Sequence, residues 1–158
     1  MTEHAIPSTR ARSALVRDLA QRNVVTAAPD CTLVDCARLM RTEHVGSLVI
    51  AEAGRPRGIL TDRDIVIEAV ALQLDPRTLT AGDVMSAPLA TVRDDDDLFD
   101  ALARMREAGV RRLPVVDGDG TLSGLLAVDN VLELLAEQVD SVVRVVKAER
   151  TRETATRP

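Results

Sequence analysis

Gly58-Ile59-Leu60-Thr61-Asp62-Arg63-Asp64 is the segment from which the rest of this sequence is most readily organised. Gly58 permits a close approach of the backbone, Ile59-Leu60 is a short apolar run typical of a strand, and Thr61 is a residue type that caps helices. The apolar residues 65–70 continue as that helix. Backbone N–H groups point outward where such a helix begins, and a nearby carboxylate can accept ribose hydroxyls. The segment therefore predicts a nucleotide site at the end of a strand.

The order strand, helix, strand, strand, helix occurs twice along the chain. Several residues of the first copy recur 65 positions later, as Leu33 recurs at Leu98. After one extra residue in a turn of the second copy, Gly58-Ile59-Leu60 recurs as Gly124-Leu125-Leu126 at an offset of 66. One copy is too small to bury its own apolar face, so the two copies are expected to pack on each other with pseudo-two-fold symmetry.

The expected fold class is α/β, with two tandem repeats of order β-α-β-β-α that form small mixed sheets flanked by helices. The expected boundaries are a flexible arm over residues 1–17, repeats over 18–73 and 83–140, a linker over 74–82, and a helix extension with a frayed tail over 141–158. The first strand is expected at residues 24–26. The final helix continues its apolar pattern through Val146, so it either lies back across its own domain or is buried in a partner subunit.

A helix in the first copy carries one of the two cysteines. The capping box at residues 32–35 predicts a helix that ends near His44. Its expected buried face comprises Leu33, Cys36, Ala37 and Met40. The spacing of Cys31 and Cys36 fits neither a zinc knuckle nor a redox C-x-x-C motif. A buried Cys36 with a partly exposed Cys31 is the favoured interpretation, and metal ligation with His44 or a disulfide to another chain stays open.

The composition excludes several classes of protein. A chain of 158 residues with 46% apolar residues can bury a core in one domain or in two small ones. The net charge of −5, the single Phe and the lack of Trp and Tyr argue against a nucleic-acid binder, which needs a basic surface and stacking platforms. No apolar run approaches the ~20 residues of a membrane helix and the N-terminus has no apolar signal core, so a cytoplasmic location and no membrane partner are expected.

Neither the histidines nor the acidic run at residues 94–97 indicates a catalytic or metal site. The histidines, His4 and His44, have no evident nucleophile and base beside them, so no catalytic residue is assigned and the chain is not expected to be an enzyme. The acidic run at residues 94–97 precedes an expected helix, where acids favour the helix dipole. It lacks the spaced ligands and glycines of a Ca²⁺ loop, so no metal site is expected there.

Taken together, these motifs resemble the tandem CBS domain, or Bateman module. The resemblance is carried by the segments Val110–Asp117, Gly120–Gly124 and, above all, Gly58–Asp64, and it covers about residues 18–140. The chain is also similar to small stand-alone bacterial CBS-pair proteins, including stress and hypoxic-response types.

The resemblance implies a regulatory module that binds an adenosine-containing ligand, such as AMP, ADP or ATP, in the cleft between the repeats. No obligatory cofactor is implied. Asp64 would hold the ribose and Thr61 the phosphate, with Arg63 beside them. The base pocket would be lined by Val24, Val25, Thr26 and Val45. A homodimer that acts on an unidentified regulated protein is expected, and a ligand-free oligomeric scaffold of the same fold is the alternative.

The second copy departs from the motif. Ala127 replaces the hydroxyl residue and Asn130 the carboxylate, with Asp129 adjacent, so one good site or none is expected. Arg111 and Arg112 stand where the family often places basic residues that face phosphates, and a solvated face is an equally open interpretation. Simple helix capping likewise remains the alternative to ligand contact for Thr61 and Asp64.

Overall fold

The structure is a computed structural model that describes residues 14–87 and 89–156. The arm predicted for residues 1–17 therefore lies outside the described residues except for its last four positions. The described elements are α1 (Val16–Leu19), β1 (Thr26–Ala27), α2 (Leu33–Glu43), β2 (Ser47–Glu52), β3 (Arg55–Thr61), α3 (Asp62–Ile65), the π-helix η1 (Val66–Val70), α4 (Ala81–Val84), β4 (Val92–Arg93), α5 (Leu98–Ala108), β5 (Arg112–Val116), β6 (Leu122–Ala127) and α6 (Val128–Thr156).

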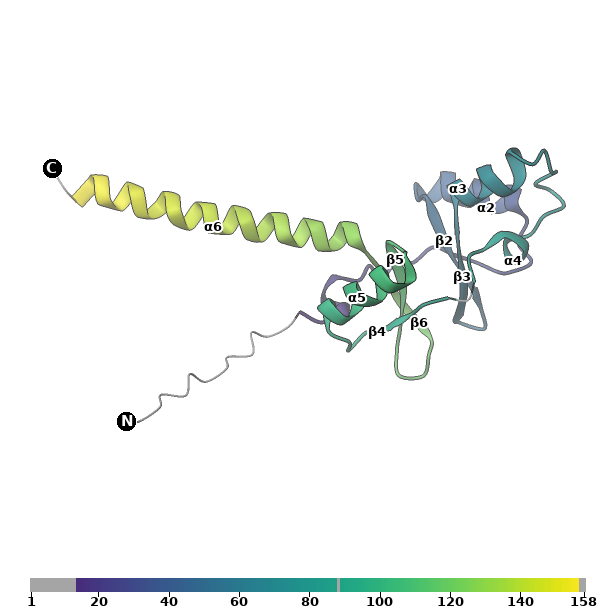
Figure 1. Cartoon of the computed structure of the whole chain (residues 1–158), viewed down its shortest axis with the longest axis horizontal. Helices are drawn as coiled ribbons and strands as arrows, with labels where there is room; N and C mark the ends of the chain where they lie inside the picture. The colour runs from purple at the N-terminus through teal and green to yellow at the C-terminus, as the bar shows by residue number, and fades with distance from the viewer. Residues whose placement is uncertain (1–13, 88, 157–158) are drawn as a thin grey trace.

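Two small mixed sheets with flanking helices confirm the predicted fold class (Figure 1). In the order β1-β2-β3, β1 pairs with β2 in parallel and β2 with β3 antiparallel, and β4-β5-β6 repeats this arrangement. Both antiparallel pairs shift register at equivalent places. In the first sheet Ile50 pairs with Gly58 and the shift follows Ile50; in the second, Val115 pairs with Gly124 and the shift follows Val115. The recurring glycines therefore mark a bulge, which bends the sheet and re-aims the end of the strand.

The first strand of each repeat is shorter than expected. The strand predicted for residues 24–26 is observed at Thr26–Ala27, although the Val49 N–H still donates to the Val25 carbonyl. In the second repeat the position equivalent to Val49 is Pro114, which has no N–H to donate. The strand β4 accordingly begins one residue further along.

The long helices of the two repeats begin and end as their sequences predict. Thr32 caps α2 and Asp97 caps α5, because each side chain accepts a backbone N–H of the first turn. Both helices end at a left-handed residue, His44 in α2 and Gly109 in α5. The prediction that Ala37 lies on the buried face of α2 was wrong, because Ala37 is exposed while Leu33, Cys36 and Met40 are buried.

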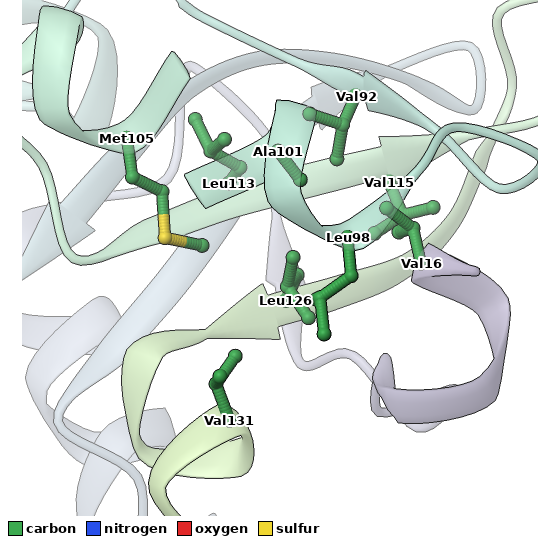
Figure 2. Packing of buried hydrophobic residues seen from close by; sticks show 9 residues of the cluster. All are labelled: Val16, Val92, Leu98, Ala101, Met105, Leu113, Val115, Leu126 and Val131. Atoms are coloured by element: carbon green, nitrogen blue, oxygen red, sulfur yellow. The ribbon is translucent and has the colours of Figure 1, made fainter. Parts of the chain in front are cut away.

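The repeats exchange their first short helices. In the described residues, α1 precedes the first repeat but its Val16 is buried in the core of the second, and α4 precedes the second repeat but its Ala81 is buried in the core of the first. Figure 2 shows the second core, whose members are Val16, Val92, Leu98, Ala101, Met105, Leu113, Val115, Leu126 and Val131. The first core comprises Leu33, Cys36, Met40, Leu48, Ile50, Leu60, Ala69 and Ala81.

The exchange is symmetric in its backbone pairing as well. Gln21 pairs with Leu125 on β6, and at an offset of 65 from Gln21, Ser86 pairs with Ile59 on β3. Each crossing segment passes directly over a motif glycine. A Cβ atom on Gly58 would lie 2.5 Å from Met85 Sδ, and one on Gly124 would lie 3.0 Å from the Gln21 carbonyl oxygen. The two glycines are thus needed where the repeats lock together.

The two closing helices differ from their predicted forms. The helix predicted after Thr61 is a single α turn followed by the π-helix η1, in which Ala69 is buried while Val66, Ile67 and Val70 are exposed. In the second repeat α6 projects away from both sheets (Figure 1), so the first of its two predicted placements, across its own domain, is not adopted, and burial in a partner subunit stays a prediction. The tail predicted to fray from Glu149 is helical as far as Thr156.

Candidate functional site

Two of the clefts between the repeats are lined by residues of the two motifs. The first, here called the valine cleft, has a volume of about 250 Å³ and is lined by Val24, Val25 and Val45 of the first repeat together with residues from the start of α6. The second, here called the arginine cleft, has a volume of about 400 Å³ and is lined by Arg63 on α3 and by Arg111 and Arg112 at the start of β5. Both are pockets between repeats rather than within one.

The two clefts are lined by equivalent residues, related by the repeat offsets of 65 and 66 positions. In the valine cleft, Val24, Val25 and Val45 face Ala127, Asp129 and Asn130. In the arginine cleft, the equivalent wall is made by Leu89, Ala90 and Val110, and the equivalent helix start supplies Thr61 and Arg63. Each cleft therefore combines the apolar wall of one repeat with the motif of the other.

The sequence predicted one pocket for the first motif and the valines, but the structure divides these residues between the two clefts. Thr61 lines the arginine cleft, whereas Val24, Val25 and Val45 line the valine cleft. Thr26 is exposed and borders a separate hollow beside Arg22. The cause is the packing of the repeats, which turns each motif away from its own repeat's wall and toward that of its neighbour. Whether any of these residues binds a ligand stays a prediction.

The motif residues Thr61 and Asp64 form a reciprocal capping box. Asp64 Oδ2 accepts the Thr61 N–H at 2.8 Å and the Thr61 hydroxyl at 2.7 Å, and the Asp64 N–H donates to Thr61 Oγ1 at 3.1 Å. The Asp62 N–H donates to the Gly46 carbonyl at 3.1 Å, which ties the helix start to the beginning of β2. Helix capping, one of the two interpretations of the sequence, is confirmed for these side chains.

The second repeat keeps the backbone half of this arrangement. The Ala127 N–H donates to Asn130 Oδ1 at 3.1 Å, and the Val128 N–H donates to the Arg111 carbonyl at 3.0 Å. Asn130 thus replaces the acceptor oxygen that Asp64 supplies in the first repeat. The second motif lacks the hydroxyl and the negative charge but retains the geometry.

The arginines give the two clefts different charge. Arg111 Nη2 lies 3.3 Å from Asp129 Oδ1, and the side chains are 75% and 57% exposed, so this ion pair is weak and easily rearranged. Arg112 is half-buried and lines both clefts. The valine cleft also holds the carboxylates of Asp129 and Glu133. An anion is therefore favoured in the arginine cleft.

Sequence reasoning missed the apolar wall of the arginine cleft. Leu89, Ala90 and Val110 lie 65 positions after Val24, Val25 and Val45, so the repeat offset itself would have identified them. Ser86, which also lines this cleft, is likewise the equivalent of Gln21 in the valine cleft. These positions carry no residue type that signals binding, which is why motif reasoning passed over them.

The cysteines play no part in either cleft. Cys36 is buried and Cys31 is half-buried, as predicted, and both are free thiols. Burial raises the pKa of the Cys36 thiol to about 12, and its Sγ lies 4.0 Å from the Cys31 carbonyl oxygen. Among the described residues, no group of three or more His, Cys, Asp or Glu side chains is placed to hold a metal ion. In the same part of the chain, none of the helices is long and apolar enough to span a bilayer.

Comparison with known proteins agrees with this geometry. The family model described as CBS domain matches residues 16–70 and 81–137. An uncharacterized protein of Methanopyrus kandleri is 40% identical over 124 residues, which are 78% of this chain and 63% of that protein, so this chain spans under two thirds of that relative's length. Hypoxic response protein 1 of Mycobacterium tuberculosis is 35% identical over 133 residues, which are 84% of this chain and 91% of that protein.

A solved structure shares the fold at lower identity. The CBS domain pair of protein MJ0100 superposes with a TM-score of 0.71 and 21% identity, covering 80% of this chain and 98% of that one. That protein was crystallised in complex with 5′-methylthioadenosine and S-adenosyl-L-methionine.

Proposed function

Because this chain belongs to the CBS domain family and forms a CBS-pair regulatory module, we propose that it binds an adenosine-containing anion between its repeats. One observation carries the proposal. Thr61 and Arg63 of the first repeat line a cleft of about 400 Å³ together with Arg111 and Arg112 of the second. Pockets for small molecules usually have volumes of roughly 300–1,000 Å³ and combine apolar walls with a few polar groups.

The arginine cleft has the chemistry that a nucleoside phosphate needs. Guanidinium groups bind phosphate oxygens with charge-assisted and often bidentate hydrogen bonds. Arg111 and Arg112, which lie immediately before and at the start of β5, would form such bonds with a bound phosphate. The apolar wall of Leu89, Ala90 and Val110 offers a surface for an adenine ring. A ligand there would touch both repeats at once, so binding would stabilise one arrangement of the repeats over others.

The two motif residues have proposed roles: Thr61 lines this cleft, and Asp64, which is not among its lining residues, is bonded to Thr61. The Thr61 hydroxyl donates its one proton to Asp64 Oδ2 in the capping box, so a bound phosphate would take over that proton in place of Asp64. Asp64 accepts ribose hydroxyls, because both of its capping bonds fall on Oδ2 and leave Oδ1 for a ligand. The valine cleft, with Asp129 and Asn130 beside Val24, Val25 and Val45, is a second and poorer site for an anion.

The module is proposed to act as a homodimer that signals to a regulated protein rather than to catalyse a reaction. The ligand class is supported by the CBS pair of MJ0100, which has the same fold and holds two adenosyl compounds. The alternative, a ligand-free oligomeric scaffold, is favoured by a different observation, the exposed apolar face of α6.

Isothermal titration calorimetry of the full chain with AMP, ADP, ATP, S-adenosylmethionine and NAD tests the ligand proposal. We expect at least one adenine nucleotide to bind, and Arg111→Ala to weaken it about tenfold or more, as loss of a charged hydrogen bond does. Arg57→Ala is the matched control, because Arg57 is also exposed and also forms one ion pair, with Glu52 at 2.9 Å. Absence of heat with every compound, or equal affinity of the Arg111→Ala variant and the wild type, would refute the proposal in favour of the scaffold.

A further inference from the structure

The final helix α6 carries a row of exposed apolar side chains along most of its length. Among the side chains of α6 that the structure describes, those of the first turns pack on the second repeat, where Val131 is 6% exposed and joins the core (Figure 2), and those from Leu135 to Arg150 are exposed. Beyond them, side chains that are 42% to 69% exposed form what we call the α6 stripe: Leu132, Leu135, Val139, Val142, Val143, Val145 and Val146. Contiguous apolar surface of this extent marks a site of interaction.

The spacing of the α6 stripe is that of a coiled coil. Leu132, Leu135, Val139, Val142 and Val146 follow one another at steps of three, four, three and four residues. An average of 3.5 residues per step keeps the row on one side of two helices that supercoil around each other. The stripe therefore fits a second helix laid along it.

The charges along α6 divide into two halves. Between Val128 and Ser141 the charged residues are all acidic, namely Asp129, Glu133, Glu137 and Asp140. From Val142 onward bases predominate in the sequence, namely Arg144, Lys147, Arg150 and Arg152, against the two acids Glu149 and Glu153. The helix dipole favours acids at the start and bases at the end only within the terminal turns, so it does not account for a division along the whole helix.

From these observations we infer that α6 pairs antiparallel with α6 of a second copy of this chain. Antiparallel pairing lays the acidic half of each helix along the basic half of the other, whereas parallel pairing would set acids against acids. It is also self-complementary, as a two-fold symmetric dimer requires. A helix of 29 residues is ~43 Å long, so antiparallel pairing would place the two CBS pairs at opposite ends of the paired helices.

This inference deepens the homodimer part of the proposed function and does not depend on the ligand. It places the interface on the one long element that projects from the module. Because the first turns of α6 also line the valine cleft through Asp129 and Glu133, the interface is continuous with the surface between the repeats.

Sedimentation velocity of the full chain tests the interface. The wild type is expected to be a dimer, and Val139→Glu, which puts a charge at the middle of the stripe, is expected to weaken the dimer at least tenfold. Ser141→Glu is the control, since it adds the same charge to the same helix away from the stripe. Val142→Glu is a second stripe variant, and circular dichroism verifies that the repeats stay folded. A monomeric wild type, or a Val139→Glu dimer as tight as wild type, would overturn the inference, and calorimetry with AMP reports separately on ligand binding.

A distance measurement tests the orientation. A spin label at Arg150→Cys, in a Cys31→Ser background, lies eleven residues from Val139 at the centre of the stripe. An antiparallel pair would separate the two labels by about 33 Å along the axis, at 1.5 Å per residue. In a parallel pair the distance between the two labels would be roughly the 8–10 Å that separates packed helix axes, plus the length of the label side chains. A short distance would overturn the antiparallel arrangement.

Discussion

Substituting Gly58 by alanine should destabilise the protein through a specific collision between the repeats. Gly58 lies at the bulge of β3, directly beneath the segment that follows α4. A Cβ atom there would lie 2.5 Å from Met85 Sδ and 2.7 Å from Met85 Cγ. Carbon atoms in contact prefer ~3.5–4.0 Å, so the Met85 side chain or the strand has to move.

The size of the effect follows from two opposing terms. Overpacking of this kind costs ~1–3 kcal/mol. Alanine in place of glycine restricts the unfolded chain and gives back ~0.4–1 kcal/mol. The net loss in the free energy of unfolding for Gly58→Ala should therefore be about 1–2 kcal/mol.

Urea denaturation of the single variants and of the double variant Gly58→Ala/Met85→Ala measures the collision directly. Met85→Ala removes the two closest atoms, so the double variant should be more stable than the sum of the two single effects predicts, by about 1 kcal/mol. Gly118→Ala is the control, because a Cβ atom on Gly118 would meet nothing within 4 Å. If the two effects add within ~0.3–0.5 kcal/mol, the residues do not collide and the proposed locking of the repeats at Gly58 is wrong.

The remaining predictions concern side chains of the first repeat. Asp64→Ala should lower the free energy of unfolding by ~1 kcal/mol, whereas Asp64→Asn should stay within ~0.5 kcal/mol of wild type because Asn130 caps the equivalent turn, as urea denaturation would show. Asp64→Asn should nevertheless weaken nucleotide binding in calorimetry, and undiminished affinity would remove Asp64 from the ligand site. Iodoacetamide at pH 8 should leave Cys36 unmodified in the folded protein, because burial raises the pKa of its thiol to about 12. After unfolding in urea, mass spectrometry should show both cysteines modified. Rapid reaction of Cys36 in the folded protein would contradict its burial.

Much of the fold follows from local patterns in the sequence. Leu33 and Met40 recur at the equivalent positions of α5, and both copies are buried, because three- and four-residue spacing places apolar side chains on one helix face. Ala37 shares that spacing but is exposed, because it lies at the edge of the face that Leu33, Cys36 and Met40 bury. Periodicity identifies the face of a helix but not its edges.

The site was harder to predict because it depends on which repeat each segment joins. Val16 and Ala81 lie in helices of only four residues, and their patterns are too short to reveal that each packs in the core of the other repeat. That exchange is what separates Thr61 from Val24 and brings it beside the arginines of β5. A motif can name the residues of a site, but the partners across a cleft come from long-range packing.

Comparison of the two motifs bears on the role of Thr61 and Asp64, because the second motif has Ala127 and Asn130 in their places. Ala127 and Asn130 form the same helix start with one acceptor oxygen, so the fold requires neither a hydroxyl nor a negative charge there. In the first motif the extra hydroxyl and the carboxylate take part in the capping box, and the second motif forms its helix start without them. That extra hydroxyl lies in the cleft lined by Arg63, Arg111 and Arg112, where a phosphate would be most favoured. A ligand role for Thr61 and Asp64 is therefore best sought in variants that keep the bond from the Thr61 N–H to the side chain at position 64 and remove only the hydroxyl or the charge.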